Sequence, residues 1–242
     1  MKRTIRNIFS LLLLAIVLNG CSKNKAGIKA EYKQMVKKTQ FFSIEYDECS
    51  TDFVDNVTSV LEENLQRIMN FFELKTISSE VTIRIYSDFD EWKSFYESAS
   101  GQQYQDYIVG CAANNIISVL AFDQYKKSNV HKNDSLEDFE KIIVHEFVHI
   151  CHNQLDIKEY SFIIGEGLAT YLANQRYNEN IKIDFPKEVI FNYEKFFSIT
   201  NDPYSFAQKI VRQITQKVSQ QKLLEYAVDS SKLYDDWEEL GL

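Results

Sequence analysis

Two periods of apolar residues run through the first half of the chain, one typical of strands and one typical of helices. Residues 81–86 are apolar at every second position, which predicts a half-buried strand, and residues 41–46 predict another. Residues 52–74 carry apolar side chains near the three- and four-residue spacing of an amphipathic helix. A shorter helix over 88–98 is predicted to begin at Asp88, because an aspartate side chain accepts a hydrogen bond from a free amide of the first helical turn.

The segment 107–122 contains two apolar runs that are separated by Asn114 and Asn115. It predicts either two strands or one strand with a kink at the asparagines. In both cases we expect an edge strand over a cleft.

Helical patterns dominate from residue 134 to the end of the chain, with predicted breaks at Pro186 and Pro203. Of the 242 residues, 45% are hydrophobic and 14% aromatic, enough for a substantial core in one domain or in one domain with two lobes. Only 7 glycines and 2 prolines are present, which excludes a collagen-like or low-complexity chain. The predicted fold class is α+β, with a sheet-bearing N-terminal half and a helical C-terminal half.

The first twenty residues have the layout of a secretory signal. Three basic residues precede an apolar run over 8–18, which is shorter than the roughly twenty residues that a membrane-spanning helix needs. The run ends in Leu18-Asn19-Gly20-Cys21, which resembles the bacterial lipobox, in which the cysteine is lipidated and becomes the new N-terminus. The alternative is an incidental cysteine after an ordinary cleaved signal, or an uncleaved anchor, and either would still export the domain.

These features divide the chain into a lipoprotein signal peptide over 1–20, a tether over 21–35 and one domain over 36–242. Loss of the signal, which carries three positive charges and no negative ones, would change the net charge from -8 to -11. An acidic domain disfavours nucleic acid as a partner. A lipid on Cys21 would hold the domain on the membrane outside the cytoplasm, which predicts a location in the bacterial cell envelope.

Three cysteines follow Cys21, namely Cys49, Cys111 and Cys151. Their odd number and wide spacing exclude a disulfide framework, and the lack of a CxxC pair gives no support to thiolate zinc chemistry. Cys151 lies near a predicted apolar helix face, so we expect it in the core.

The pentapeptide His145-Glu146-Phe147-Val148-His149 is an HExxH motif. Histidines four residues apart lie one turn apart on one face of a helix, so both imidazoles can bind the same metal ion. The flanking sequence predicts that helix, with capping side chains at 133–135 and an apolar stripe opposite the histidines. Glu146 would lie beside the metal, where it can act as the base toward an attacking water.

A catalytic zinc site needs a third protein ligand, and the sequence offers Glu166 and His152. His145 and His152 would lie roughly 10 Å apart along the helix axis, too far for all three histidines to meet one ion. Glu166 comes from a separate segment, and Gly165 and Gly167 beside it allow close backbone packing. We therefore predict Glu166 as the third ligand and His152 as a cleft residue or a partner of the ligands.

The sequences HEFVH and EGLATY together resemble the gluzincin metallopeptidases, in particular the peptidase-MA-like group, over roughly residues 107–228. The resemblance implies a zincin-like fold, with His145, His149 and Glu166 as zinc ligands and Glu146 as the general base. It also implies that the predicted edge strand pairs with an extended peptide substrate. The spacer before Glu166 is shorter than in the thermolysin-like members, so their subsites do not transfer to this chain.

Two further positions follow from the resemblance. Thr170 stands where thermolysin-like enzymes place an aspartate that supports a histidine, and its hydroxyl could accept the same hydrogen bond. Tyr204, after the helix start Asp202-Pro203, is the candidate donor to the oxyanion, and simple packing of its ring is the alternative. His131 is expected to be a solvated loop residue.

The resulting hypothesis is a membrane-anchored, extracytoplasmic zinc metallopeptidase that hydrolyses peptide or protein substrates. The alternative is a non-catalytic, zinc-containing lipoprotein that acts as a binding or assembly module. Glu146 favours the enzyme, because a structural zinc site does not require a base. A solute-binding lipoprotein would explain the anchor but neither motif.

Overall fold

The computed structural model describes residues 35–47 and 51–242. The predicted signal peptide, the lipidation residue Cys21 and all of the predicted tether except Met35 lie outside these residues, as does Cys49. The chain forms two compact units. The described parts of residues 1–63 and 78–143 make up the first unit, and residues 64–77 and 144–242 make up the second. The chain passes between the units at three points. Two of them fall inside helices, α2 (Thr51–Phe71) and α5 (Leu136–His152), and the third lies between residues 77 and 78.

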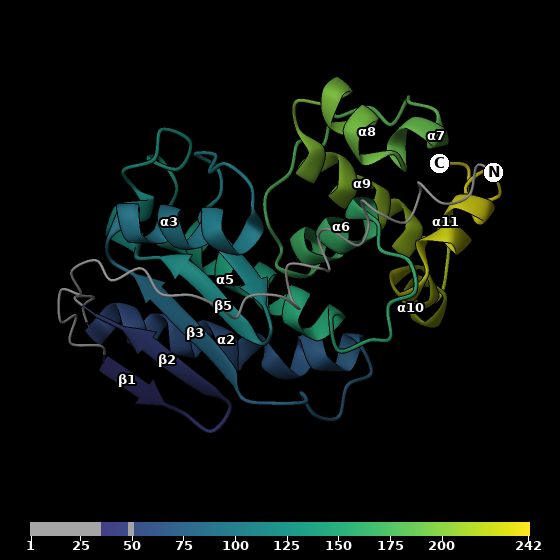
Figure 1. Cartoon of the computed structure of the whole chain (residues 1–242). Coiled ribbons are helices and arrows are strands. Elements are labelled where there is room, and N and C mark those ends of the chain that lie inside the picture. The colour runs from purple at the N-terminus through teal and green to yellow at the C-terminus, as the bar shows by residue number, and fades with distance from the viewer. Residues whose placement is uncertain (1–34, 48–50) are drawn as a thin grey trace. The chain divides into compact units, whose positions relative to one another are not determined.

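A mixed five-stranded sheet dominates the first unit (Figure 1). Its strand order is β1-β2-β3-β5-β4; β2 and β3 are parallel, as are β3 and β5, whereas the two outer strands are antiparallel to their neighbours. The bounds of the strands are β1 (Met35–Lys38), β2 (Phe42–Tyr46), β3 (Val81–Tyr86), β4 (Gly110–Ala113) and β5 (Ile116–Leu120). The strands predicted over 41–46 and 81–86 are therefore confirmed.

The segment 107–122 forms two strands joined by a tight turn, not one kinked strand. Asn114 and Asn115 both have positive φ, 51° and 57°, which is the conformation that a two-residue hairpin requires and that asparagine tolerates. The Asn115 side chain also donates a 2.6 Å hydrogen bond to Ser79 Oγ. The hairpin makes β4 an edge strand of the described sheet, as predicted.

The opposite edge strand, β1, was not predicted. Its residues are mostly exposed and two of its four residues are lysines, so it has no alternation of apolar and polar positions that would reveal a strand. Its partner β2, in contrast, begins with three buried residues. Lysines are common on edge strands, where they oppose pairing with a further chain.

Helices connect the parallel strands of the first unit. The first turns of α2 follow β2, and α3 (Phe89–Ser100) follows β3. Asp88 caps α3 as predicted, because its Oδ1 accepts a 2.8 Å hydrogen bond from the amide of Glu91. A short helix, α4 (Phe122–Tyr125), comes after β5. The core of the unit consists of fully buried residues from these elements, among them Phe42, Ile44, Ile83, Trp92, Ile117, Val119 and Tyr125.

His131 does not lie in solvent, contrary to the expectation from sequence. Its Nδ1 is 2.8 Å from Asp134 Oδ2, its ring stacks on Tyr125 with centroids 4.6 Å apart, and its side chain is 14% exposed. The Tyr125 hydroxyl donates to the same carboxylate oxygen. The polar residues around His131 suggested a loop, but the loop folds back onto a buried tyrosine, which local composition does not reveal.

The second unit has helices, connecting loops that include 153–161 and 173–186, and one isolated bridge, with no strand among its described residues. Besides the ends of α2 and α5, its helices are α6 (Phe162–Leu172), α7 (Lys187–Ile190), α8 (Tyr193–Ile199), α9 (Pro203–Thr215), α10 (Gln220–Val228) and α11 (Ser230–Asp236). The predicted breaks at Pro186 and Pro203 are helix starts, since Pro186 precedes α7 and Pro203 is the first residue of α9. A proline fits there because the first amides of a helix need no partner within it.

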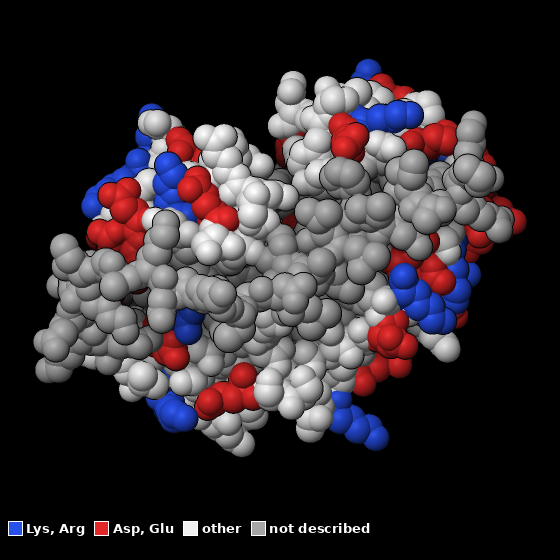
Figure 2. Space-filling view, in the orientation of Figure 1, with Lys and Arg blue, Asp and Glu red and all other residues white. Residues whose placement is uncertain are grey.

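All described strands precede residue 121 and the helical part follows, so the predicted α+β class is confirmed. No helix in the described part of the chain is long and apolar enough to cross a membrane. On the face shown in Figure 2, the described basic and acidic side chains lie interspersed.

Candidate metal centre

Helix α5 carries the HExxH motif, and its sequence explains why it begins where it does. Ser135 and Asp138 cap it reciprocally: Ser135 Oγ accepts from the amide of Asp138 at 3.1 Å, and Asp138 Oδ2 accepts from the amide of Ser135 at 2.9 Å. This arrangement satisfies amides that the first turn leaves without helical partners. Ser135 was one of the predicted capping residues. The predicted apolar stripe is buried at Phe139, Ile143, Phe147 and Ile150, and Cys151 is buried as expected.

Helix α6 brings Glu166 to the same place. Ser161 caps its start by accepting from the amide of Ile163. A side chain at Gly167 would place its Cβ 2.6 Å from Val211 Cγ2 and 2.7 Å from the backbone oxygen of Ala207, so only glycine permits this approach of α6 to α9. Gly165 is likewise in contact with the ring of Tyr160. The two glycines beside Glu166 therefore allow the close packing that was predicted from sequence.

His145, His149 and Glu166 form a cluster of three donors that could hold a metal ion. His145 Nε2 lies 3.1 Å from Glu166 Oε2, His149 Nε2 lies 3.4 Å from Glu166 Oε1, and the two Nε2 atoms are 3.0 Å apart. A tetrahedral ion with bonds of about 2.0–2.1 Å separates its donor atoms by roughly 3.3 Å. The spacing of the three donors therefore fits a small tetrahedral ion, with one position left for another ligand.

A fourth residue, Gln175, orients the first histidine. Its Oε1 lies 3.1 Å from His145 Nδ1, and an amide oxygen can only accept, so Nδ1 of His145 carries the proton of this bond. In a neutral imidazole the lone pair is then on Nε2, the atom that faces His149 and Glu166. Metal-binding histidines usually have such a partner on their other nitrogen.

Thr170, which the sequence suggested for this supporting role, does not fill it. Its hydroxyl donates back to the carbonyl oxygens of Glu166 at 2.7 Å and Gly167 at 3.1 Å, within its own helix. A threonine hydroxyl inside a helix readily makes such bonds to the preceding turn. The supporting acceptor comes instead from the residues just after α6.

The turn that carries Gln175 is held by hydrogen bonds to α6 and to α9. Asn174 has a φ of 52°, the left-handed conformation that commonly ends a helix, and the amide of Gln175 donates to Thr170 O. Gln208, buried on α9, donates from Nε2 to the carbonyl of Gln175 at 3.1 Å. Gln175 was not predicted from the sequence. An asparagine after a helix is a recognisable end signal, but nothing local says that the next side chain reaches a histidine 30 residues away.

Glu146, the candidate base, is buried beside the donors. Burial raises its pKa to about 7, the negative charge of Glu166 acts in the same direction, and His149 opposes the rise. Glu166 shows the opposite net effect. Its burial favours the neutral acid, but the charge of His149 and the hydrogen bonds with both histidines outweigh burial and hold its pKa well below the usual range.

Tyr204, the candidate oxyanion donor, lies beside the donor cluster. Asp202 caps α9 by accepting from the amide of Ser205, and Tyr204 follows in the first turn. Its ring centroid is 6.5 Å from that of His145, and 37% of the residue is exposed. Tyr204 therefore lies at the rim of the donor cluster, and its ring centroid is 5.5 Å from that of Phe162.

Aromatic side chains continue outward from Tyr204. Phe162 also contacts Phe197 at 4.8 Å, and Tyr193 contacts Phe197 at 4.4 Å between centroids. Tyr193 is 51% exposed. We call these four residues, Phe162, Tyr193, Phe197 and Tyr204, the aromatic rim; it links the donor cluster to an apolar surface that water reaches.

His152 is not a cleft residue, contrary to the expectation from sequence. It is 1% exposed, its ring stacks on Phe72 with an interplanar angle of 15°, and its Nε2 lies 2.9 Å from Ala227 O. Burial lowers its pKa to about 4, although the hydrogen bond with Ala227 opposes the shift. His152 is therefore a neutral core residue that donates to a carbonyl, and the donor cluster has three members.

The geometry of Gln175 yields a first testable prediction. Gln175→Ala should weaken metal binding by roughly 10- to 100-fold, because His145 loses the acceptor that fixes its tautomer and orientation. A competition titration with a chelating indicator measures this loss. Gln175→Glu, which keeps an acceptor, should retain the affinity, and Gln216→Ala, at an exposed glutamine after α9, serves as the control. Equal affinities for Gln175→Ala and the unsubstituted protein would remove Gln175 from the site.

Comparison with models of known protein families and with curated proteins finds no match for this chain.

Proposed function

We propose that this chain is a zinc-dependent hydrolase. The observation that carries the proposal is the donor cluster, in which the imidazole nitrogens of His145 and His149 and the Glu166 carboxylate have the spacing of a tetrahedral ion. The carboxylate of Glu146 comes from α5, the helix that carries both histidines. Two histidines and one carboxylate with an open position are the ligand set of catalytic zinc. A site of purely structural zinc normally has four protein ligands and no adjacent base.

Within that class, we propose a metallopeptidase of the gluzincin type with a zincin-like fold. The order of the motifs supports it, since HEFVH on α5 is followed by EGLATY on α6, the pattern that resembles the peptidase-MA-like group. The export signal and Cys21 would place the enzyme in the bacterial cell envelope, lipid-anchored and outside the cytoplasm.

Each residue of the site has a role in this proposal. A bound zinc ion would supply Lewis-acid activation of water and of the scissile carbonyl. Glu146 would accept the proton of the attacking water and pass it to the leaving amine. The Tyr204 hydroxyl would donate to the carbonyl oxygen as negative charge develops on it.

Two surfaces are suited to a peptide substrate. The edge strand β4 pairs with β5 on one side only in the described sheet, and an extended peptide can add to an edge strand through main-chain hydrogen bonds. The aromatic rim offers an apolar surface next to His145 for a side chain of the substrate. Both features favour a peptide over a small polar ligand.

The proposal is tested by metal analysis of the purified protein together with digestion of a peptide library. We expect one zinc per chain, a higher melting temperature with zinc than with chelator, and cleavage that chelator abolishes and zinc restores. Absence of zinc, with no gain of stability on its addition, would contradict the site. Tight zinc binding without cleavage would favour the alternative, a non-catalytic zinc-containing lipoprotein that binds or assembles other components.

Tyr204→Phe tests the proposed oxyanion donor. The variant should lower kcat by about 10²-fold and change KM much less, because a donor to the developing charge acts mainly in the transition state. Steady-state kinetics on a cleaved library peptide measures both constants. Tyr193→Phe is the matched control, since it removes a hydroxyl from the same aromatic rim at a residue without ring contact to His145. Unchanged kinetics for Tyr204→Phe would return Tyr204 to a packing role.

A further inference from the structure

Helix α9 carries a stripe of polar side chains that is largely withdrawn from water. Ser205, Gln208, Lys209 and Arg212 recur at intervals of three and four residues, which places them on one side of the helix. Ser205 and Gln208 are buried, and Lys209 and Arg212 are half-buried. Polar side chains in such positions need bonding partners, because burial of an unbonded polar group is costly. We call these four residues the polar stripe.

The partners of the polar stripe lie in one segment, the end of α6 and the chain that follows it. Ser205 Oγ accepts from the amide of Asn178 at 2.9 Å. Lys209 Nζ donates to the carbonyl oxygens of Glu179 at 2.9 Å and Ile181 at 2.6 Å. These bonds fix the backbone of a stretch that belongs to no helix or strand.

Gln208 bonds to the residue that supports His145. Its Nε2 donates to the carbonyl oxygen of Gln175 at 3.1 Å and, in a longer contact, to that of Thr170 at 3.4 Å. Its Oε1 has no hydrogen-bond partner among the described residues, so both bonds of this buried amide go to the same short segment. Gln208 thereby joins Gln175 to the last turns of α6, the helix that also carries Glu166.

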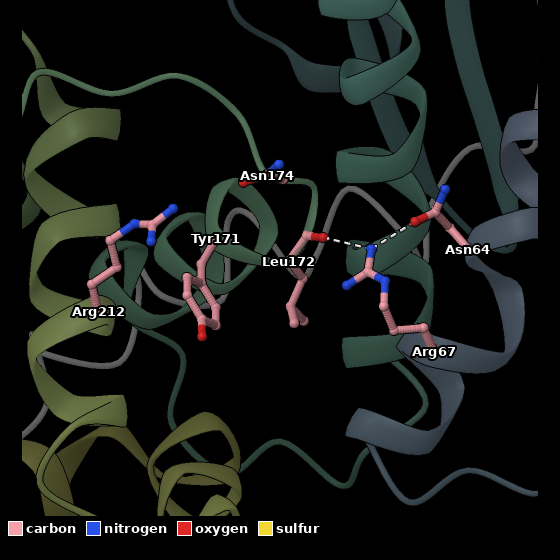
Figure 3. Close-up of a pocket in the computed structure, with 6 residues that line it drawn as sticks. All are labelled: Asn64, Arg67, Tyr171, Leu172, Asn174 and Arg212. Carbon is pink, nitrogen blue, oxygen red and sulfur yellow. Dashed lines mark hydrogen bonds between the residues drawn. The ribbon is translucent and has the colours of Figure 1, made fainter.

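Arg212 contacts residues on both sides of Gln175 in the sequence. Its guanidinium carbon lies 5.2 Å from the ring centroid of Tyr171 and 4.8 Å from that of Tyr177. Arginine stacks favourably on aromatic rings at such distances. Figure 3 shows Arg212 on α9 beside Tyr171, with Asn174 in the turn that follows. The polar stripe therefore holds the turn before and after Gln175.

The same turn borders a hollow of about 510 Å³ (Figure 3). The side chains that line it come from α2, α6, α9 and the turn, and they are Asn64, Arg67, Tyr171, Leu172, Asn174 and Arg212. Side-chain packing restrains the turn incompletely where it meets this open space. Specific contacts therefore contribute more to its position, among them those of the polar stripe and the 2.7 Å hydrogen bond from Arg67 to Leu172 O.

Gln175 can fix His145 only as firmly as its own backbone is fixed. Its Oε1 lies 3.1 Å from His145 Nδ1, but it belongs to a loop, and loops are more mobile than the elements they connect. Helix α9 reaches the donor cluster as well, because Tyr204, one turn before Gln208, has its ring beside His145. One helix thus contacts both the donor cluster and the residue that supports it.

We propose that the polar stripe positions Gln175 for the metal centre, with Gln208 as the main positioning residue. The inference rests on the zinc site proposed above. Gln208 bonds to the backbone of Gln175, so it acts on His145 through Gln175. A residue that merely stabilised the fold would leave the zinc affinity of the folded protein unchanged. A positioning residue lowers that affinity, and does so only while Gln175 is present.

Gln208→Met tests this role, because methionine has a similar length but no N–H donor. We expect the zinc affinity to fall about tenfold, the lower end of the loss that follows removal of a group supporting a metal ligand. Combined with Gln175→Ala, the substitution should add little, since effects transmitted through one residue are not additive. A competition titration with a chelating indicator compares both single variants, the double variant and the unsubstituted protein.

Gln213→Met is the matched control. Gln213 lies on α9 outside the polar stripe, and its side chain makes no hydrogen bond among the described residues. A second readout is the visible absorption of Co²⁺ bound in place of zinc, which reports the geometry of the ligands. It should change in Gln208→Met in the same direction as in Gln175→Ala and stay unchanged in the control.

Melting temperatures in chelator show whether each variant folds. If Gln208→Met does not fold, Arg212→Gln decides the outcome. It removes the contacts with both tyrosines and should weaken zinc binding severalfold, but not on the Gln175→Ala background.

Three results would count against the proposal. Equal zinc affinity and equal Co²⁺ absorption in Gln208→Met and the unsubstituted protein would overturn the positioning role and leave the metal centre intact. A loss of the same size with and without Gln175 would also overturn it, because Gln208 would then act by another route. Lack of zinc binding by the unsubstituted protein would contradict the metal centre itself, and this role with it.

Discussion

Glu146→Gln is expected to lower turnover by several orders of magnitude while the protein keeps its fold and its metal. Glutamine has the shape of glutamate but cannot accept the proton of the attacking water, so the proton transfer loses its base. The donor atoms of His145, His149 and Glu166 are untouched by the substitution. Hydrolysis of a cleaved library peptide, measured together with zinc content and melting temperature, separates loss of chemistry from loss of structure.

Glu137→Gln provides the matched control for this experiment. Glu137 lies in the first turn of the same helix, its side chain is 75% exposed, and it pairs with Lys141. An exposed pair of this kind contributes little to stability, so the control should retain activity, zinc and fold. If Glu146→Gln remained active, the role of base would pass to another group and the peptidase proposal would lose its main catalytic residue.

Glu166→Ala should weaken zinc binding by more than 10²-fold, whereas His152→Ala should leave the zinc affinity of the folded protein unchanged. The Glu166 carboxylate approaches both histidines, with Oε2 3.1 Å from His145 Nε2 and Oε1 3.4 Å from His149 Nε2. His152 instead faces Phe72 and Ala227 in the core. Removal of one of three ligands leaves an incomplete site. A competition titration with a chelating indicator compares the two variants directly.

The same two variants should rank in the opposite order in stability without metal. His152→Ala removes a buried ring and leaves Ala227 O without its donor, so we expect it to lower the free energy of unfolding by about 2–4 kcal/mol. Thermal unfolding in the presence of chelator measures this effect. A larger loss of zinc affinity in His152→Ala than in Glu166→Ala would overturn the assignment of the third ligand and the resemblance to gluzincins with it.

Much of the candidate site was accessible from sequence because its signals are local. The spacing of His145 and His149 places them on one helix face whatever the remaining chain does, and the polar cap at Ser135 marks where that helix begins. Glu166 was found by its motif and by the two glycines beside it, which permit close approach of α6 to its neighbours. The strands over 81–86 and 41–46 followed from alternation and from a buried apolar run.

The missed elements lack such local signals. Strand β1 is an exposed edge strand with two lysines, so it shows no alternation. His131 and His152 were assigned from the polarity or the helical face around them, but each stacks on a ring from another element, His131 on Tyr125 and His152 on Phe72.

Sequence by itself determined the α+β class, the HExxH helix and the three residues of the candidate metal centre, since periodicity and motif spacing depend on residues within a few turns of one another. The tertiary structure alone decided which side chain supports His145. Gln175, and not Thr170, accepts the hydrogen bond from His145. The hydroxyl of Thr170 is bonded within its own helix, whereas the left-handed turn at Asn174 directs the chain back to α5. The hollow between Asn64, Tyr171 and Arg212 has the same origin, because its lining residues lie up to 148 positions apart in the chain and no local pattern encodes their proximity.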